Sequence, residues 1–378
     1  MKGALLGLVV VACSSSPSPD SPAGALDAGL ESSVKADSSA GGSPAVDAGD
    51  SEASAPEAGG VVLTAAHCPG GKAGPAVGSE LFVAASGTDG RIASTLDGEV
   101  WQDVTTSSKG PTTPGHTRNL IRGVGYGGGI FVAVGGYDNA YISTTCDGVN
   151  FRQDVLGTNT DAAPSPPYDN FLEEVTFADG ALIAVGGAGL RLRSTDYSLT
   201  WQSTGSYYDG HLRGVVTGNG RVVAVGHDWG GGNGIWTTST DAGASWAPMQ
   251  SAPGELYDIA YGNGVFVAVG PDHCVTSADG SAWSPCDASA GSAFRDVRFI
   301  AGKWYLQRLD GSYVSSADAT VWSGSSPGFL PLATARGTSR FVMVNVQTRG
   351  YSTDFVNWKE FPYPGLENLT VGTVTYTP

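Results

Sequence analysis

Basic residues are scarce in this sequence. Its 378 residues include 20 Lys and Arg but 36 Asp and Glu, which gives a formal net charge of −16 at pH 7. Proteins bind nucleic acids largely through cationic side chains that neutralise phosphates. The charge balance therefore argues against DNA or RNA as a partner.

Phosphate-binding loops and dinucleotide fingerprints are also missing from the chain. Such motifs place a Gly-rich loop directly before a helix. The Gly-rich stretches of this sequence instead fit tight turns between strands. We therefore expect no cofactor.

A membrane-spanning apolar run is absent too, since the N-terminal run at residues 5–12 is too short to cross a bilayer. Lys2 precedes this run and Cys13 follows it, which resembles a bacterial lipoprotein signal. The resemblance makes residues 1–13 the signal and Cys13 the lipidated first residue of the mature chain. The alternatives are an ordinary signal peptide or a chance apolar start.

The expected location is the bacterial cell envelope, because Ser14 and Ser15 after the lipidated residue are similar to outer-membrane lipoproteins. Display toward the periplasm or the cell surface stays open. Residues 14–60 contain mostly Ser, Ala, Pro, Gly and Asp, and cannot bury enough apolar surface to fold. We expect them to form a disordered tether, followed by one folded domain at 61–378.

One turn motif occurs seven times in the folded part of the sequence. Each copy begins with Ser and ends on an aromatic residue. An Asp stands at the third or fourth position in six copies and at the fifth position in the remaining one. The copies lie at 94–101, 143–151, 194–201, 239–246, 277–283, 316–322 and 352–358. A repeat of roughly 40–50 residues with about four strands per unit is typical of a β-propeller.

Each Asp is expected to accept main-chain N–H groups inside its own turn, and the aromatic residue to pack between neighbouring sheets. Because the same residues recur in seven places, we assign them to the architecture rather than to catalysis. These structural residues are Asp97, Asp147, Asp196, Asp241, Asp279, Asp318 and Asp354. We call the seven motifs the Asp turns.

A second motif precedes several Asp turns: a Gly-containing turn followed by an apolar run, at 127–134, 179–185, 218–225 and 262–269. Together the two motifs resemble bacterial Asp-box (BNR-type) repeat propellers, a group with sialidase-like, sortilin-like and photosystem-assembly-factor-like members. The resemblance covers residues 80 to 378. It implies an all-β, seven-bladed β-propeller of four-stranded antiparallel blades.

Blade 1 lacks an inner strand at its own place in the sequence. The segment 366–371 (LENLTV) aligns with the inner-strand segment 172–177 (LEEVTF). We therefore expect the C-terminal strand to join blade 1 and close the ring, which removes free sheet edges.

Two faces follow from the expected strand order. The Gly turns and the Asp turns lie at one end of the ring, the Asp-turn rim. The long insertions at 105–119, 157–170, 203–210 and 227–234 all lie at the other end, which we call the loop face. Loops on a rigid scaffold commonly carry binding sites, so the loop face is the candidate functional surface.

Five cysteines are present, and use of Cys13 for lipid leaves four in an exported chain. Cys274 and Cys286 flank a turn symmetrically, which favours a cross-strand disulfide. Cys68 and Cys146 both map to the Asp-turn rim, so a second bridge between them is plausible. Buried free thiols are the alternative for all four.

The segment 61–68 (VVLTAAHC) matches the stretch around the catalytic His of trypsin-like proteases. In that family His67 would be the general base, but the required later Ser motif is missing and the downstream repeats predict a different fold. We therefore treat His67 as incidental.

One ring of residues occupies the same inner-strand position in successive blades and is expected to line the central channel: Arg122, Glu173, Arg213, Tyr257, Arg295, Leu332 and Glu367. Three Arg could clamp a carboxylate, and sialidases use an Arg triad with a Tyr–Glu pair. That family has six blades and an FRIP-type stretch that this chain lacks. Mutually paired, solvated charges are the simpler interpretation, with Glu173 and Tyr257 as the pair to test for hydrolysis.

The loop face also carries His116, His211, His227 and His273, and the aromatic residues Tyr168, Tyr207, Tyr208 and Trp229. Histidines with Asp228 and Asp272 could hold a divalent metal, but no ligand spacing supports it and we expect no metal. The aromatic residues suit sugar stacking or protein contact, or simply pack their own loops.

The sequence thus predicts a lipid-anchored, extracytoplasmic and monomeric propeller that binds a protein or glycan partner without catalysis. The candidate binding residues are Arg122, Glu173, Arg213, Tyr257, Arg295, His227 and Trp229. The alternative is a propeller-type glycan hydrolase, sialidase-like, or a lyase. The only expected membrane contact is the lipid on Cys13.

Overall fold

The protein is described from a computed structural model. The described residues are 63–71, 80–86, 91–105, 120–136, 140–156, 171–205, 210–230, 232–286, 293–326, 333–337, 339–344, 348–362 and 369–374. Cys13 and the predicted tether 14–60 lie outside these ranges, as do His116, Tyr168, Tyr207, Tyr208, Leu332 and Glu367. Within them, no helix is long and apolar enough to cross a membrane.

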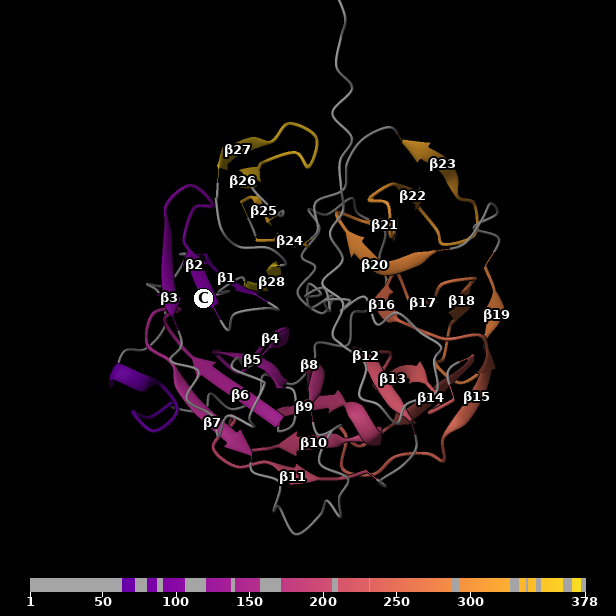
Figure 1. The fold of residues 1–378 in the computed structure, drawn as a ribbon, viewed down its shortest axis with the longest axis horizontal. Coiled ribbons are helices and arrows are strands. Elements are labelled where there is room, and N and C mark those ends of the chain that lie inside the picture. The colour runs from indigo at the N-terminus through magenta and orange to yellow at the C-terminus, as the bar shows by residue number, and fades with distance from the viewer. Residues whose placement is uncertain are drawn as a thin grey trace, which may run out of the picture.

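The described strands form seven four-stranded antiparallel sheets arranged as the blades of a propeller, which confirms the predicted fold class (Figure 1). Blade 1 contains β28 (Leu369–Val374), β1 (Leu81–Ser86), β2 (Arg91–Thr95) and β3 (Trp101–Thr105). Blade 2 contains β4 (Ile121–Gly127), β5 (Ile130–Gly136), β6 (Ala140–Thr145) and β7 (Arg152–Leu156). Blade 3 contains β8 (Leu172–Ala178), β9 (Ala181–Gly186), β10 (Arg191–Ser194) and β11 (Gln202–Ser203).

The other four blades repeat this order from the channel outward. Blade 4 contains β12 (His211–Gly218), β13 (Arg221–His227), β14 (Asn233–Ser239) and β15 (Gln250–Pro253). Blade 5 contains β16 (Asp258–Gly262), β17 (Val265–Val269), β18 (Cys274–Ser277) and β19 (Ser284–Pro285). Blade 6 contains β20 (Phe294–Ile300), β21 (Lys303–Arg308), β22 (Tyr313–Ser316) and β23 (Ser323–Ser326), and blade 7 contains β24 (Ala333–Arg336), β25 (Phe341–Val344), β26 (Thr348–Ser352) and β27 (Lys359–Pro362). Two short 3-10 turns, η2 (Pro69–Gly71) and η3 (Gly187–Gly189), complete the described elements.

The hairpins between first and second strands explain the Gly motif. Asn219 and Gly220 both have positive φ, 48° and 66°, and Asn263 and Gly264 repeat this at 49° and 75°. Two consecutive residues at positive φ define the tight hairpin turn whose twist matches the strands, and Asn and Gly tolerate it best. The apolar run that follows forms the second strand, which in β5 is buried along its whole length.

The ring closes as predicted, because β28 pairs with β1 in blade 1. The predicted inner strand 366–371 is displaced, however, since β28 begins at Leu369 and ends at Val374. Val371 lies opposite Ala84, the place that Val175 holds opposite Ala184 in blade 3. The Leu-Glu pattern used for the alignment therefore misplaces the register by two residues, a shift that preserves which backbone positions face each side of the sheet.

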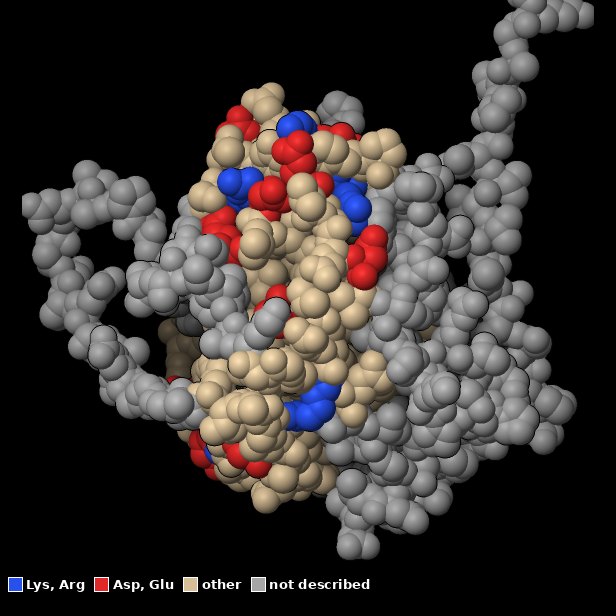
Figure 2. Space-filling model, turned by 90° about the vertical axis from the view of Figure 1, so that its left-hand side faces the viewer, with Lys and Arg blue, Asp and Glu red and all other residues tan. Residues whose placement is uncertain are grey.

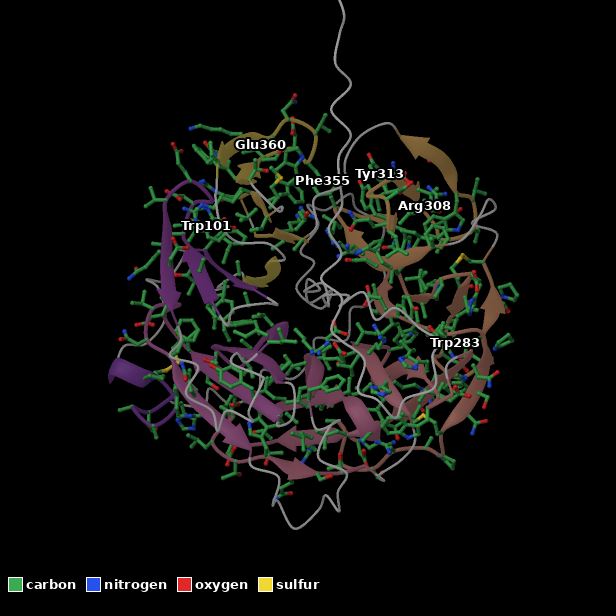
Figure 3. All side chains as sticks on the ribbon, in the orientation of Figure 1. Trp101, Trp283, Arg308, Tyr313, Phe355 and Glu360 are labelled. Atoms are coloured by element: carbon green, nitrogen blue, oxygen red, sulfur yellow. A yellow bond between two sulfur atoms is a disulfide. The ribbon has the colours of Figure 1, made fainter. Side chains whose placement is uncertain are left out.

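Among the described residues, the core consists of seven separate apolar clusters, one between each pair of neighbouring blades. Each blade alone buries little, and stacking around the ring supplies the buried surface. Between blades 6 and 7 the packing is aromatic: Phe355 lies 5.1 Å from Phe341 and 5.2 Å from Tyr305, measured between ring centroids. Phe355 and Tyr313 are seen at this junction in Figure 3.

Polar contacts also join blade 7 to blade 1. Glu80 accepts hydrogen bonds from the main-chain N–H and the hydroxyl of Ser339, both at 2.7 Å. Lys359 lies 3.0 Å from Glu99 in a salt bridge on the outside of the same junction. Figure 2 shows acidic and basic side chains close together in the upper part of this side of the molecule.

Candidate functional site

The seven Asp carboxylates are engaged inside their own turns. Each accepts a main-chain N–H from a residue two to four positions later, and each accepts the hydroxyl of the Ser or Thr two positions earlier. Hydrogen bonds to the charged form favour ionisation. The hydroxyl and N–H of Ser245 lower the pKa of Asp241 to about 2, and the pKa values of the other six are also lowered. Carboxylates held in this way fix the turn.

The Asp turns also lock each blade onto the preceding one. Gly280 has φ +70°, and a Cβ atom there would lie 2.6 Å from Cγ2 of Val223 in blade 4. Gly148 is equivalent, with φ +71° and a Cβ position 2.8 Å from the Ser94 side chain in blade 1. Trp101 and Trp283 close two of these turns on opposite sides of the ring (Figure 3).

Both cysteine pairs are joined. A disulfide links Cys68 to Cys146, and another links Cys274 to Cys286 across blade 5. The first attaches residues 63–71 to the Asp turn of blade 2. His67 belongs to this attached segment, where its Nδ1 lies 2.9 Å from the Thr64 hydroxyl and 3.0 Å from the Thr64 main-chain nitrogen. This local contact gives His67 a role in the segment's turn.

The predicted channel residues share one structural device. In blades 2, 3, 4 and 6 the pairing between first and second strands skips a single residue, and the skipped residues are Arg122, Glu173, Arg213 and Arg295. Tyr257 is similar, since its N–H donates to the Val269 carbonyl although Asp258 is the residue paired with Val269. Such β-bulges redirect a side chain and are frequent beside functional sites. We call these five residues the bulge ring.

Contacts within the bulge ring link neighbouring blades at the loop-face end of the inner strands. The Arg122 guanidinium lies 3.2 Å from the Glu173 carboxylate, and it also stacks 4.4 Å from the ring centre of Phe171. The Arg213 guanidinium lies 4.9 Å from the ring centre of Tyr257. Glu173, the proposed partner of Tyr257 in hydrolysis, is thus held by a cation of the preceding blade.

Two acidic residues directly after the bulges fasten the frame of this site. The Glu174 carboxylate accepts the main-chain N–H of Val215 at 2.6 Å, and the Asp258 carboxylate accepts that of Val297 at 2.8 Å. Both side chains are buried, and each bond reaches the inner strand of the next blade. We did not predict these residues from the sequence, although an acidic residue inside an apolar inner strand was the available signal.

Trp229 belongs to a cluster of rings on the loop face of blade 4, with His211 at its centre. Its ring centre lies 4.7 Å from that of His211, in an edge-to-face arrangement. His211 stacks on His227 at 5.1 Å, since the two residues are directly paired across β12 and β13. Phe171 of blade 3 lies 5.7 Å from His211 and so connects this cluster to Arg122.

The loop that carries Trp229 is fixed at its base. Asn233 donates its side-chain N–H to the Asp228 carboxylate at 2.7 Å, and the Gly232 N–H donates to Glu255 at 3.1 Å. Trp229 is nevertheless 43% exposed. An exposed Trp that packs against His211 is the type of side chain that most often anchors an interface.

The possible metal site receives no structural support. Within the described ranges, no three His, Cys, Asp or Glu residues come together in a way that could hold a metal ion. His273 lies instead in a partly buried position where desolvation lowers its pKa.

Comparisons with known proteins found no matching family model and no matching curated protein. Solved structures do match. PorZ, described as an essential bacterial surface component of the type-IX secretion system of Porphyromonas gingivalis, has 13% identity and a TM-score of 0.51, over 72% of this chain and 44% of that one. YCF48 bound to D1 peptide has 14% identity and a TM-score of 0.48 over 71% and 89%, and YCF48 from Cyanidioschyzon merolae has 15% and 0.48 over 71% and 94%. At these identities the comparisons show the fold alone: the chain is a β-propeller.

Proposed function

We propose that this protein is a lipid-anchored, extracytoplasmic propeller of the Asp-box group whose loop face binds a protein or glycan partner without chemical turnover. The observation that supports the proposal is the continuity of the bulge ring with the Trp229 cluster. Side chains from blades 2, 3 and 4 contact one another in sequence, from Arg122 through Phe171 and His211 to Trp229.

The chemistry of this surface suits recognition. Aromatic and Arg side chains dominate the energetics of interfaces when they lie near the centre of a buried patch. The bulge ring supplies three Arg, of which Arg122 pairs with Glu173 and Arg213 stacks on Tyr257. A guanidinium can bind a carboxylate through two parallel hydrogen bonds. The Asp turns, by contrast, use their carboxylates for their own main chain.

One experiment distinguishes binding from hydrolysis. A glycan array and affinity capture from envelope extracts would be run with the wild type, Trp229→Ala and Arg213→Ala, beside a fluorogenic glycoside panel. We expect specific capture that falls at least tenfold in both variants, as for a hot-spot residue worth about 1.4 kcal/mol or more. Ala282→Ser on the Asp-turn rim is the matched control and should bind like the wild type.

Two results would contradict the proposal. Glycoside turnover that disappears in Glu173→Gln would make the loop face a hydrolase site. Capture that is unaffected by both loop-face substitutions would place the binding site elsewhere.

A further inference from the structure

The Asp-turn rim exposes large apolar side chains unevenly. Seven such side chains are exposed in the described part of the chain, and five of them lie in Asp turns: Leu96, Val100, Leu199, Val321 and Val356. Single exposed apolar residues are common on soluble proteins and need no explanation. Their concentration at one end of the ring is the feature of interest.

Four of the five belong to three consecutive blades. Val321 is 74% exposed in blade 6, Val356 is 76% exposed in blade 7, and Val100 is 72% exposed in blade 1 beside Leu96 at 55%. We call these four residues the apolar arc. In the Asp turns of blades 4 and 5, the exposed residues ahead of the Trp include Ala244 and Ala282, so the arc does not extend around the ring.

The turns of the arc are held next to one another. Lys359, directly after the blade 7 turn, forms its salt bridge with Glu99 of the blade 1 turn. Arg340 of blade 7 donates to the main-chain oxygen of Asp97 in that same turn at 2.8 Å. Phe355 of the blade 7 turn also lies 5.2 Å from Tyr305 of blade 6, measured between ring centroids. The three blades that carry the arc are thus held to one another by side-chain contacts.

The N-terminal part of the chain enters the propeller at the same rim. The Cys68–Cys146 disulfide fixes residues 63–71 to the Asp turn of blade 2, and Arg152 donates to the Ala66 carbonyl at 2.8 Å. Leu63 packs against the apolar cluster between blades 2 and 3. Residues 14–62 separate this point from Cys13 in the sequence.

We propose that the apolar arc rests on the lipid surface to which Cys13 anchors the chain, so that the loop face points away from the membrane. The inference rests on the lipid anchor of the proposed function and adds a second contact to it. The lipid tail holds the rim within reach, and the arc selects the orientation. Because the net charge is −16, the fitting surface is zwitterionic rather than anionic.

The test uses the chain from Cys13 to Pro378, produced without lipid modification. Cys13 is the one cysteine outside the two disulfides, so a maleimide lipid attaches there and mimics the anchor on phosphatidylcholine vesicles. Hydrogen–deuterium exchange is then compared with the same chain free in solution. We expect slower exchange at 97–100, 318–321 and 354–357, and unchanged exchange at 228–233.

Matched substitutions separate apolar contact from charge. Val321→Asp with Val356→Asp should abolish the protection, because burying each Val favours the bound state about tenfold. Ala244→Asp with Ala282→Asp adds the same charge to the same rim and should leave it intact. Phosphatidylglycerol vesicles should give weaker protection than phosphatidylcholine.

Three outcomes would overturn the inference: equal exchange on vesicles and in solution, protection of the loop face, or rim protection in the free chain that grows with protein concentration, which would make a second copy the occupant. Mass spectrometry of the mature N-terminal peptide tests Cys13 lipidation separately. If the rim is protected on vesicles but Cys13 is unmodified in cells, the proposed lipid anchor is wrong and the membrane contact of the apolar arc stands. If Cys13 is lipidated in cells but the rim is not protected on vesicles, only the membrane contact of the apolar arc is wrong.

Discussion

Gly280→Ala is the substitution that most sharply tests how the blades are locked together. The residue has φ +70°, and the added Cβ would lie 2.6 Å from Cγ2 of Val223 in the preceding blade. A residue other than Gly in this left-handed region costs about 1–2 kcal/mol, and forcing a methyl group into a packed interface costs about 1–3 kcal/mol. Together we expect a loss of about 2–5 kcal/mol in the free energy of unfolding.

Ala319→Gly is the matched control, because Ala319 occupies the equivalent place in the Asp turn of blade 6 at φ 62°. It removes the backbone cost but also a buried methyl group worth about 0.8 kcal/mol. The two effects oppose each other, so we expect a change within about 1 kcal/mol. Urea unfolding followed by Trp fluorescence measures both variants. Equal stability of Gly280→Ala and the wild type would refute the reasoning, and so would equal losses in the two variants.

Two further predictions concern stability. The pKa values of the seven turn Asp residues are lowered in the folded protein, so the stabilisation that these residues provide is fully present above about pH 4, their unfolded pKa, and is lost as the pH falls through their folded pKa values. The urea midpoint should therefore drop between pH 5 and pH 2, and it should drop less in Asp241→Asn. An unchanged midpoint at pH 2 would contradict the turn chemistry. Replacing Cys68 and Cys146 by Ser, which opens a bridge between residues 78 positions apart, should cost about 2–5 kcal/mol; calorimetry that finds the melting temperature of the double variant unchanged would show that the N-terminal segment is held without the bridge.

The fold was accessible from the sequence because the Asp turns and Gly turns are local devices. Asp97 and its equivalents form their hydrogen bonds within a few residues, so a short motif specifies the turn wherever it occurs. Repetition of that turn then fixes the number of blades. The closure of the ring by the C-terminal strand followed from the missing inner strand of blade 1. This strand, β28, begins at Leu369, three residues after the predicted start at 366.

The details of the loop-face site were less accessible because they depend on contacts between blades. The ring of equivalent positions could be read from the repeat, but the β-bulge that sets Arg122 apart from the strand pairing has no local signature. Likewise, the bond from Glu174 to Val215 joins residues 41 positions apart. The packing of Trp229 against His211 arises from a cross-strand pair and a Gly-rich loop, and neither identifies the ring contact in advance.

Site-specific photo-crosslinking in intact cells tests the central claim most directly. A photoreactive residue would replace Gly230, an exposed neighbour of Trp229 on the loop face, in one strain and Ala282 on the opposite rim in another. The account predicts an adduct with a partner protein or glycan from position 230 and none from position 282. A partner adduct from position 282, with none from position 230, would contradict the assignment of the loop face as the binding surface.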